Sequence, residues 1–196
     1  MTIIVKLGGC NGSGKSSVAK ALLNTKSKHV VEHKKKRPLV YTAEHGGASW
    51  AILGNYENAC GGMDTISDKY ERLELVRRYA NEEDMGVVFF EGLITGKTYG
   101  AFGDMSENDG NAWLYAFMDT PFDVCVERVM QRRSAAGNMA PFDPERTMRS
   151  TFRSVESVAR RAQEVGHEVI MLDHTEPAAT LAKRLIAKVK TMQVLK

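Results

Sequence analysis

The segment that most constrains this chain is residues 9–16, which read GCNGSGKS. It follows the apolar residues 3–7, precedes a helical pattern over residues 17–23, and has the spacing G-x-x-x-x-G-K-[ST]. Such glycines let successive backbone N–H groups point into one concavity at the N-terminus of a helix, where phosphate is bound. We predict a nucleotide-binding loop in which Lys15 reaches the β- and γ-phosphates and Ser16 holds Mg²⁺. A chance glycine-rich turn would not need the flanking strand and helix.

The composition limits the classes of protein to which the chain can belong. Its 196 residues, 43% of them hydrophobic, fit one α/β domain over residues 1–196 with a normal core. The formal net charge of +3 permits an anionic substrate or nucleic acid without requiring either. Cys10, Cys60 and Cys125 lack Cys-x-x-Cys spacing, which favours reduced thiols over a disulfide framework or a zinc site. Because we find no leader and no membrane-spanning run, we expect a cytoplasmic protein.

A basic run at residues 26–37 contains Lys26, Lys28, Lys34, Lys35, Lys36 and Arg37, opposed only by Glu32. Such a run is typical either of a solvated loop or of contact with nucleic-acid phosphates, and both interpretations stay open. Residues 38–53, divided by Gly46-Gly47, predict an antiparallel hairpin rather than part of a parallel sheet.

Residues 54–64 combine amides, an aromatic ring, two carboxylates and several glycines, without a helical or strand period. A purely structural loop would explain the glycines but not so many groups able to read a base or sugar edge. We therefore expect a substrate loop, which together with the hairpin forms an acceptor region at about residues 38–66. The substrate-binding residues expected here are Asn55, Tyr56, Asn58 and Asp64.

The apolar strand predicted over residues 86–92 contains Glu91 near its carboxyl end. In a sheet that carries a phosphate-binding loop, this position sets a carboxylate beside Mg²⁺, directly or through water. The alternative is that Glu91 is a simple cap. We interpret it as a functional residue because four apolar residues precede it.

A second buried strand, over residues 113–119, leads through Pro121 into a helix that runs to about Arg133. Arg128 and Arg132 lie four residues apart on one face of this helix, and Arg133 is adjacent to them. The small polar residues that follow predict a lid at about residues 133–143.

Asp143 as N-cap and Pro144 as first helical residue open a long helix to Val165, which Gly166 ends. Two lines of residues run along this helix. The expected core stripe is Met148, Phe152, Val155, Ala159 and Ala162, and the arginine line, either solvated or in contact with phosphate, is Arg146, Arg149, Arg153 and Arg160.

The order of strands and helices predicts an α/β fold with a mainly parallel sheet, helices on both faces and the site at the carboxyl edge. The chain resembles P-loop kinases of the thymidylate-kinase-like class, a three-layer fold in which a lid arginine series follows a turn similar to Asp119-Thr120-Pro121. Within this class, residues 54–64, 90–93 and 119–121 resemble bacteriophage kinases that phosphorylate 5-hydroxymethyluracil in DNA. Thymidylate kinases carry an Asp-Arg pair where this chain has Glu91-Gly92, so a neutral hydroxyl fits better than a monophosphate acceptor.

This resemblance implies an ATP-dependent phosphotransferase with an alcohol acceptor. ATP and Mg²⁺ bind residues 9–16, and the 5-hydroxymethyl oxygen attacks the γ-phosphate to give 5-phosphomethyluracil, a step in thymidine hypermodification of phage DNA. The target nucleotide is flipped out and stacked on Tyr56, and Asp64 or Glu91 orients or deprotonates the hydroxyl. The expected catalytic residues are Lys15, Asp64, Glu91 and Arg132. Arg133 is expected to bind the substrate together with the loop residues named above. The expected nucleotide-binding residues are Gly9, Asn11, Gly12, Ser13, Gly14, Lys15, Ser16, Ser17, Arg128 and Arg132.

Two other functions stay open at this point. One is a kinase of a free nucleoside, nucleotide or other small hydroxyl compound. The other, a nucleotide-dependent switch, is less favoured because the sequence has no N-K-x-D motif and no D-x-x-G after Phe90. An arginine-bearing lid also suits phosphoryl transfer better than switching. The sequence assigns no oligomeric state.

Overall fold

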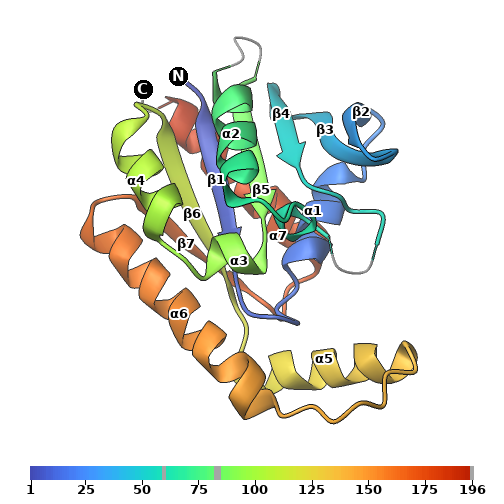
Figure 1. Cartoon of the computed structure of the whole chain (residues 1–196). Helices are drawn as coiled ribbons and strands as arrows, with labels where there is room; N and C mark the ends of the chain where they lie inside the picture. Colours follow the sequence, from blue (N-terminus) through green and yellow to red (C-terminus); the bar gives the residue numbers. More distant parts are fainter. Residues whose placement is uncertain (59–60, 82–84, 195–196) are drawn as a thin grey trace.

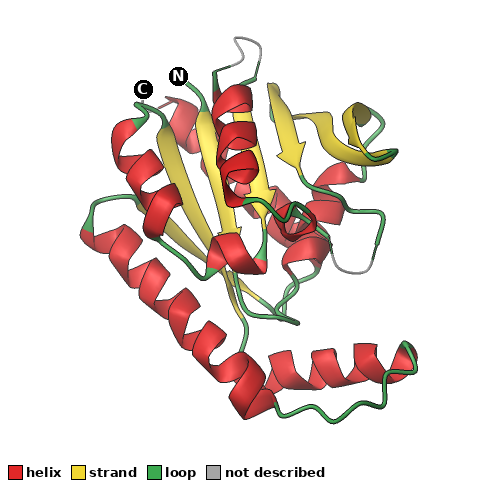
Figure 2. Cartoon of the chain, viewed as in Figure 1, coloured by secondary structure: helices red, strands yellow, loops and turns green. Residues whose placement is uncertain are grey.

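The computed structural model describes residues 1–58, 61–81 and 85–194, and its strands and helices are shown in Figures 1 and 2. In chain order these elements are β1 (Ile3–Gly8), α1 (Lys15–Leu23), β2 (His29–Lys34), β3 (Arg37–His45), β4 (Ala48–Leu53), the 3₁₀ turn η1 (Met63–Thr65), α2 (Lys69–Ala80), β5 (Val87–Glu91), α3 (Leu93–Gly96), α4 (Gly100–Asn108), β6 (Ala112–Asp119), α5 (Phe122–Ala135), α6 (Pro144–Glu164), β7 (Glu168–Asp173) and α7 (Ala178–Val194).

One sheet joins the strands in the order β2-β3-β4-β5-β1-β6-β7. From β4 to β7 all neighbours are parallel, so their carboxyl ends share one edge, the lower edge in Figure 1. The strand β1 leads into the glycine-rich loop and lies between β5, which ends at Glu91, and β6, which ends at Asp119. The predicted α/β fold with a mainly parallel sheet is therefore confirmed, and its topology gathers these segments at one edge.

The strands β3 and β4 form the predicted antiparallel hairpin, but the hairpin belongs to the main sheet. The strand β4 also pairs in parallel with β5, with Trp50 opposite Val87 and Leu53 opposite Phe90. The prediction that residues 38–53 lie apart from the parallel sheet is therefore wrong. The physical reason is burial: residues 50–53 are all buried, as expected of an internal strand with neighbours on both sides.

The strand β2 is an edge strand that lies within the basic run at residues 26–37. The sequence alone left open whether this run is a solvated loop or a contact for phosphates. It pairs antiparallel with β3, with register shifts around Glu32. Lys35 and Lys36 form the turn and have φ angles of 50° and 65°. A left-handed conformation at both turn residues suits the twist of a tight hairpin. The usual sequence of such a turn is Asn-Gly, so the Lys-Lys sequence did not predict a hairpin here.

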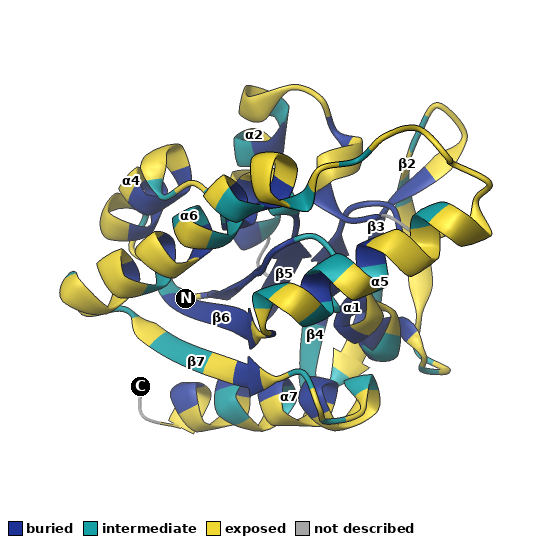
Figure 3. Cartoon of the chain, turned by 90° about the horizontal axis from the view of Figure 1, so that it is seen from below, coloured by how far each residue is buried: buried dark blue, intermediate teal, exposed yellow. Residues whose placement is uncertain are grey.

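Helices cover both faces of the sheet, as Figure 3 shows from the carboxyl edge. The helices α1 and α7 pack on one face through residues such as Leu22 and Leu185. The helices α2, α4 and α6 cover the other face, with Val76 and Val158 among the buried side chains. This confirms the three-layer arrangement. No helix within the described residues is long and apolar enough to cross a membrane.

The helices α5 and α6 extend below the carboxyl edge of the sheet in Figure 1 and are joined by residues 136–143. Asp143 is the N-cap of α6 as predicted, since its carboxylate accepts the backbone N–H of Arg146 at 3.2 Å. The core stripe is shifted from the predicted one, because Phe152 and Ala159 are only partly buried. The buried residues of α6 are Met148, Thr151, Val155, Val158 and Ala162.

Candidate active site

The loop between β1 and α1 packs tightly against α5. Gly12 has a φ of 79°, and a Cβ there would lie 2.4 Å from the backbone oxygen of Cys125, so glycine is required on both counts. The buried Lys15 donates from Nζ to the carbonyl oxygens of Gly9 and Cys10, each at 2.9 Å. The ammonium is therefore already held at the rim of the loop.

Glu91, at the end of β5, lies opposite Ser16, and Ser16 Oγ donates to Glu91 Oε1 at 2.9 Å. The Glu91 side chain is buried, and burial raises its pKa to about 7 although the charge of Lys15 and the Ser16 hydrogen bond act in the other direction. Gly62 packs on this carboxylate, since a Cβ there would lie 2.4 Å from Oε1. A hydroxyl and a carboxylate at this separation are oxygen donors of the kind that Mg²⁺ binds.

Asp64, in η1, is held by the first turn of the short helix α3. Its carboxylate accepts the backbone N–H groups of Leu93 and Ile94, the latter at 3.0 Å. A Cβ at Gly92 would lie 2.8 Å from Asp64 Oδ1, so a larger residue there would displace the carboxylate. The segment that follows Glu91 thus holds a second carboxylate, that of Asp64, in a fixed position.

A cavity of about 460 Å³ connects the glycine-rich loop with both carboxylates. Beside the loop, the cavity is also lined by Gly61, Asp64, Glu91 and Leu93, a set that we call the acidic wall. The predicted site residues that line this cavity are Asn11, Gly12, Ser13, Gly14, Lys15, Ser16, Ser17, Asp64, Glu91, Arg128 and Arg132.

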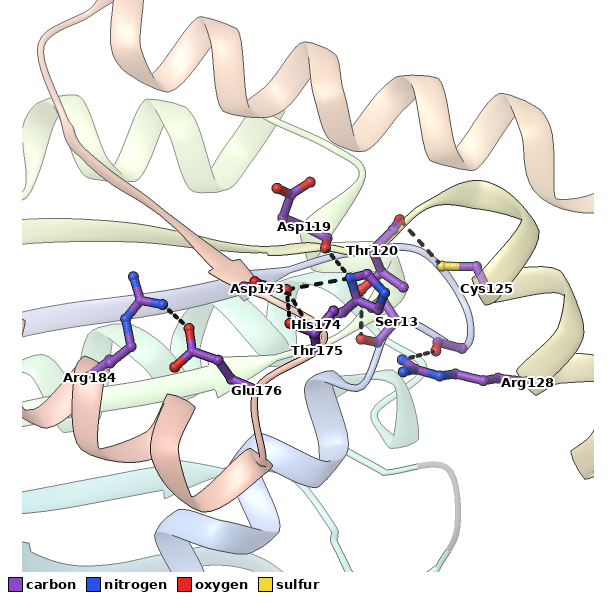
Figure 4. A network of polar contacts seen from close by, with 11 residues as sticks. Ser13, Asp119, Thr120, Cys125, Arg128, Asp173, His174, Thr175, Glu176 and Arg184 are labelled. Carbon is purple, nitrogen blue, oxygen red and sulfur yellow. Dashed lines mark hydrogen bonds and ion pairs between the residues drawn. The ribbon is translucent and has the colours of Figure 1, made fainter.

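Side chains from α5 and from the residue that follows β6 fasten the loop, as Figure 4 shows. Thr120 Oγ1 donates to the carbonyl oxygen of Ser13 at 3.0 Å, and Arg128 Nη1 donates to that of Gly12 at 3.4 Å. Arg128 therefore lies at the loop as predicted. The free, buried thiols of Cys10 and Cys125 lie in the same small cluster, and interaction with the Cys125 thiol lowers the pKa of Cys10. Cys60 lies outside the described residues.

The arginines of α5 and α6 have different surroundings. Arg132 is exposed and lines the cavity. Arg133 turns instead to the lid segment, where it donates to the backbone oxygen of Ala140 at 2.7 Å and lies 4.6 Å from the ring centroid of Phe142. On α6, Arg149 pairs with Glu145 and covers the ring of Phe122, and Arg160 pairs with Glu164.

The substrate loop is more buried than its composition indicates. Tyr56 is 5% exposed, packs against Tyr41 and donates its hydroxyl to the carbonyl oxygen of Leu53 at 3.0 Å. Asn55 is also buried and donates from Nδ2 to the carbonyl oxygen of Pro38 at 2.9 Å. Asn58 is exposed. Binding of substrate by Asn55, Tyr56, Asn58 and Arg133 stays a prediction, because none of them lines the cavity.

Eight cavity residues were not among the predicted site residues: Val18, Gly61, Leu93, Met118, His174, Glu176, Ala178 and Leu181. His174 Nδ1 lies 2.9 Å from the carbonyl oxygen of Asp119, which fixes the ring between the ends of β6 and β7 (Figure 4). A usable signal did exist for His174, because it directly follows a parallel strand that ends at the same edge. No local pattern marks Glu176 or Leu181.

A family model described as 5-hmdU DNA kinase, where 5-hmdU is 5-hydroxymethyldeoxyuridine, matches residues 3–175. The chain belongs to the 5-hmdU DNA kinase family. A 5-hmdU DNA kinase of Pseudomonas phage PaMx11 is 29% identical over 173 residues, covering 87% of this chain and 90% of the relative. Another, from Pseudomonas phage M6, is 29% identical over 138 residues, covering 65% of this chain and 71% of the relative.

Solved structures of other proteins share the fold of this chain. A gluconokinase from Sinorhizobium meliloti 1021 superposes with a TM-score of 0.52 at 15% identity, covering 97% of this chain and 92% of that one. A chain of the PezAT toxin–antitoxin system of Streptococcus pneumoniae gives a TM-score of 0.51 at 12% identity, covering 100% and 88%. At such identities the likeness shows the fold alone. The match to the 5-hmdU DNA kinase family confirms the expected resemblance to the phage kinases. It also confirms that the chain is a phosphotransferase that uses a nucleotide and a hydroxyl acceptor.

Proposed function

We propose that this family member transfers the γ-phosphate of ATP to the 5-hydroxymethyl group of 5-hydroxymethyluracil in phage DNA, giving 5-phosphomethyluracil. The observation that carries this proposal is the acidic wall beside the phosphate-binding loop. Its four described residues include two carboxylates and no cation. Such a wall repels a phosphorylated acceptor group, whereas it accepts a hydrogen bond from a neutral hydroxyl.

The residues divide into a phosphate side and an acceptor side. Lys15, Arg128 and Arg132 lie where positive charge stabilises the transferring phosphoryl group. Ser16 and Glu91 would hold Mg²⁺, with Glu91 acting directly or through water, and the ion would neutralise charge on the phosphate oxygens. Asp64 or Glu91 accepts the hydrogen bond of the attacking hydroxyl and orients its oxygen.

The two carboxylates differ in what they offer the hydroxyl. Asp64 is exposed and held by two backbone N–H groups, so it is a fixed acceptor at the cavity surface. Glu91 is buried and bonded to Ser16, on the metal side of the wall. We therefore assign hydroxyl orientation to Asp64 and support of the metal site to Glu91. A base in a duplex cannot bring its substituent to this wall, so the target nucleotide is flipped out.

The test is a transfer assay with γ-labelled ATP and matched acceptors. These are an oligonucleotide with one 5-hydroxymethyluracil, the same oligonucleotide with thymine, and the free nucleoside 5-hydroxymethyl-2′-deoxyuridine. We expect label only on the hydroxymethylated oligonucleotide, in nuclease-released 5-phosphomethyl nucleotide. Faster labelling of the free nucleoside would establish a small-molecule kinase instead. Label on the thymine oligonucleotide would indicate a kinase of DNA ends.

A further inference from the structure

A second cavity, of about 450 Å³, lies on the acceptor side of the molecule beside the β2–β3 turn. We call it the basic pocket. Its polar lining consists of Lys34, Lys35 and Arg37 from the hairpin and Asn55, Thr65 and Ser67 from the loops around η1. The pocket therefore combines three cations with hydroxyl and amide groups.

The cations of the basic pocket differ in what they already bind. Lys34 is ion-paired with Glu71 of α2, and its charge is largely neutralised. Lys35 and Arg37 are exposed, and none of the ion pairs found within residues 1–58, 61–81 and 85–194 includes either of them. Two positive charges are therefore available to an anionic ligand at the rim.

The turn itself supplies a matched comparison. Lys35 and Lys36 are adjacent, both are exposed and both have left-handed backbone, yet only Lys35 lines the pocket. Left-handed backbone favours glycine or asparagine over lysine, so the lysines are not explained by the turn geometry. A role for the Lys35 side chain in binding would account for its presence there.

The basic pocket is one loop away from the active site. Thr65 of the pocket directly follows Asp64 of the acidic wall. The backbone oxygen of Asn55 accepts the N–H of Gly62 at 2.8 Å, and Gly62 packs on the carboxylate of Glu91. A single pair of bridged loop segments thus lies between the two cavities.

We propose that the basic pocket binds a phosphodiester of the acceptor strand, close to the nucleotide whose base enters the active site. Arg37 presents a planar set of donors to two phosphate oxygens, Lys35 supplies a second charge, and the Ser67 hydroxyl is a further donor. Contacts of this kind fix the register of a strand without reading its sequence. This inference rests on the proposed function, because it needs an acceptor base that is part of DNA.

The experiment maps single phosphates by fluorescence anisotropy in the absence of ATP. A labelled single-stranded oligonucleotide carries one 5-hydroxymethyluracil, and in each member of a series one phosphodiester near that base is replaced by a neutral methylphosphonate. For the unmodified protein, we expect one or two adjacent replacements to weaken binding about tenfold, the scale of a charge-assisted hydrogen bond. The other replacements should change affinity much less.

The variants assign that phosphate to the pocket. In a Lys35→Met/Arg37→Met protein, the methylphosphonate that weakens binding of the unmodified protein should no longer change affinity. The magnitude of the slope of log affinity against log salt should also decrease by about 0.7 for each phosphate that the protein no longer neutralises. Lys36→Met, which changes the same turn outside the pocket, should keep the sensitive position. A double variant that stays sensitive there, a Lys36→Met protein that loses the sensitivity, or the lack of any sensitive position would overturn the inference.

Transfer to the unmodified oligonucleotide, measured in parallel, separates this inference from the proposed function. Phosphate mapping that gives the expected pattern without any transfer would refute the proposed function and leave the pocket assignment standing. Transfer without a phosphate that depends on Lys35 and Arg37 would refute the pocket assignment alone. Thermal melts of each variant show that the comparison is between folded proteins.

Discussion

A lysine buried in the middle of β1 leads to a quantitative prediction about stability. Lys6 is 1% exposed, and its Nζ donates to the carbonyl oxygen of Thr98 at 3.3 Å and lies 4.9 Å from the ring centroid of Tyr115. None of the salt bridges within the described residues includes Lys6. Burial lowers the pKa of this amine from 10.5 to about 7.

The sign of the pH effect follows from proton binding. Above pH 7 the unfolded chain keeps its proton on Lys6 up to a pKa of 10.5, whereas the folded protein releases it. Stability therefore rises with pH across this window, with a slope approaching about 1.4 kcal/mol per pH unit. Between pH 7 and pH 9 the rise due to Lys6 is about 2 kcal/mol, because the amine is already half deprotonated at pH 7. Tyr115 does not interfere, since burial raises the pKa of its hydroxyl.

The assay is urea unfolding of the parent and of Lys6→Met at pH 7 and pH 9. Methionine fills a similar volume without a charge, so we expect Lys6→Met to be the more stable protein at pH 7 and its advantage to shrink by about 2 kcal/mol at pH 9. Lys183→Met, at an exposed position of α7, is the control and should show no such change. An equal difference between Lys6→Met and parent at both pH values would refute the reasoning.

Three further predictions concern the active site. Lys15→Ala should lower turnover about 100- to 1,000-fold because it removes a charge from the transferring phosphoryl group, and near-normal turnover by the folded variant would remove the kinase mechanism. Arg132→Ala should lower turnover about tenfold or more while the melting temperature stays close to the parent's, since this side chain is exposed; equal losses of both would make it a structural residue. Glu91→Gln keeps an acceptor for the Ser16 hydroxyl but removes the negative charge, so the Mg²⁺ concentration for half-maximal turnover should rise several-fold. An unchanged Mg²⁺ requirement would take Glu91 away from the metal site.

The parts of the site that the sequence predicted are those with a local signal. The spacing around Lys15 defines the loop without any knowledge of the rest of the chain, because each glycine answers a local backbone requirement. Glu91 and Asp119 could be placed at one edge because apolar strands precede them and parallel strands share their carboxyl ends. Asp143 and Pro144 gave the start of α6 for a similar reason, as capping is a property of a few consecutive residues.

The parts that could not be predicted depend on which segments meet in three dimensions. The substrate loop was expected to offer Tyr56 to a flipped base, but Tyr56 packs against Tyr41 from a neighbouring strand. Arg133 is adjacent to Arg132 in sequence, yet it lies on the face of α5 that meets Phe142 rather than the cavity. The turn at Lys35 has no favourable local propensity and is imposed by the pairing of β2 with β3.

The position of β2 at the edge of the sheet has a consequence for solubility. An edge strand presents unpaired backbone N–H and C=O groups, to which a strand of another molecule can add. Val30 and Val31 are 38% and 49% exposed on this strand, so the edge also carries apolar surface. The lysines and the register shift around Glu32 oppose such addition through charge repulsion and local twist. The positive charge of this hairpin therefore has two effects: it keeps copies of the protein apart, and it faces a polyanion. Variants that neutralise this charge will tend to self-associate through β2.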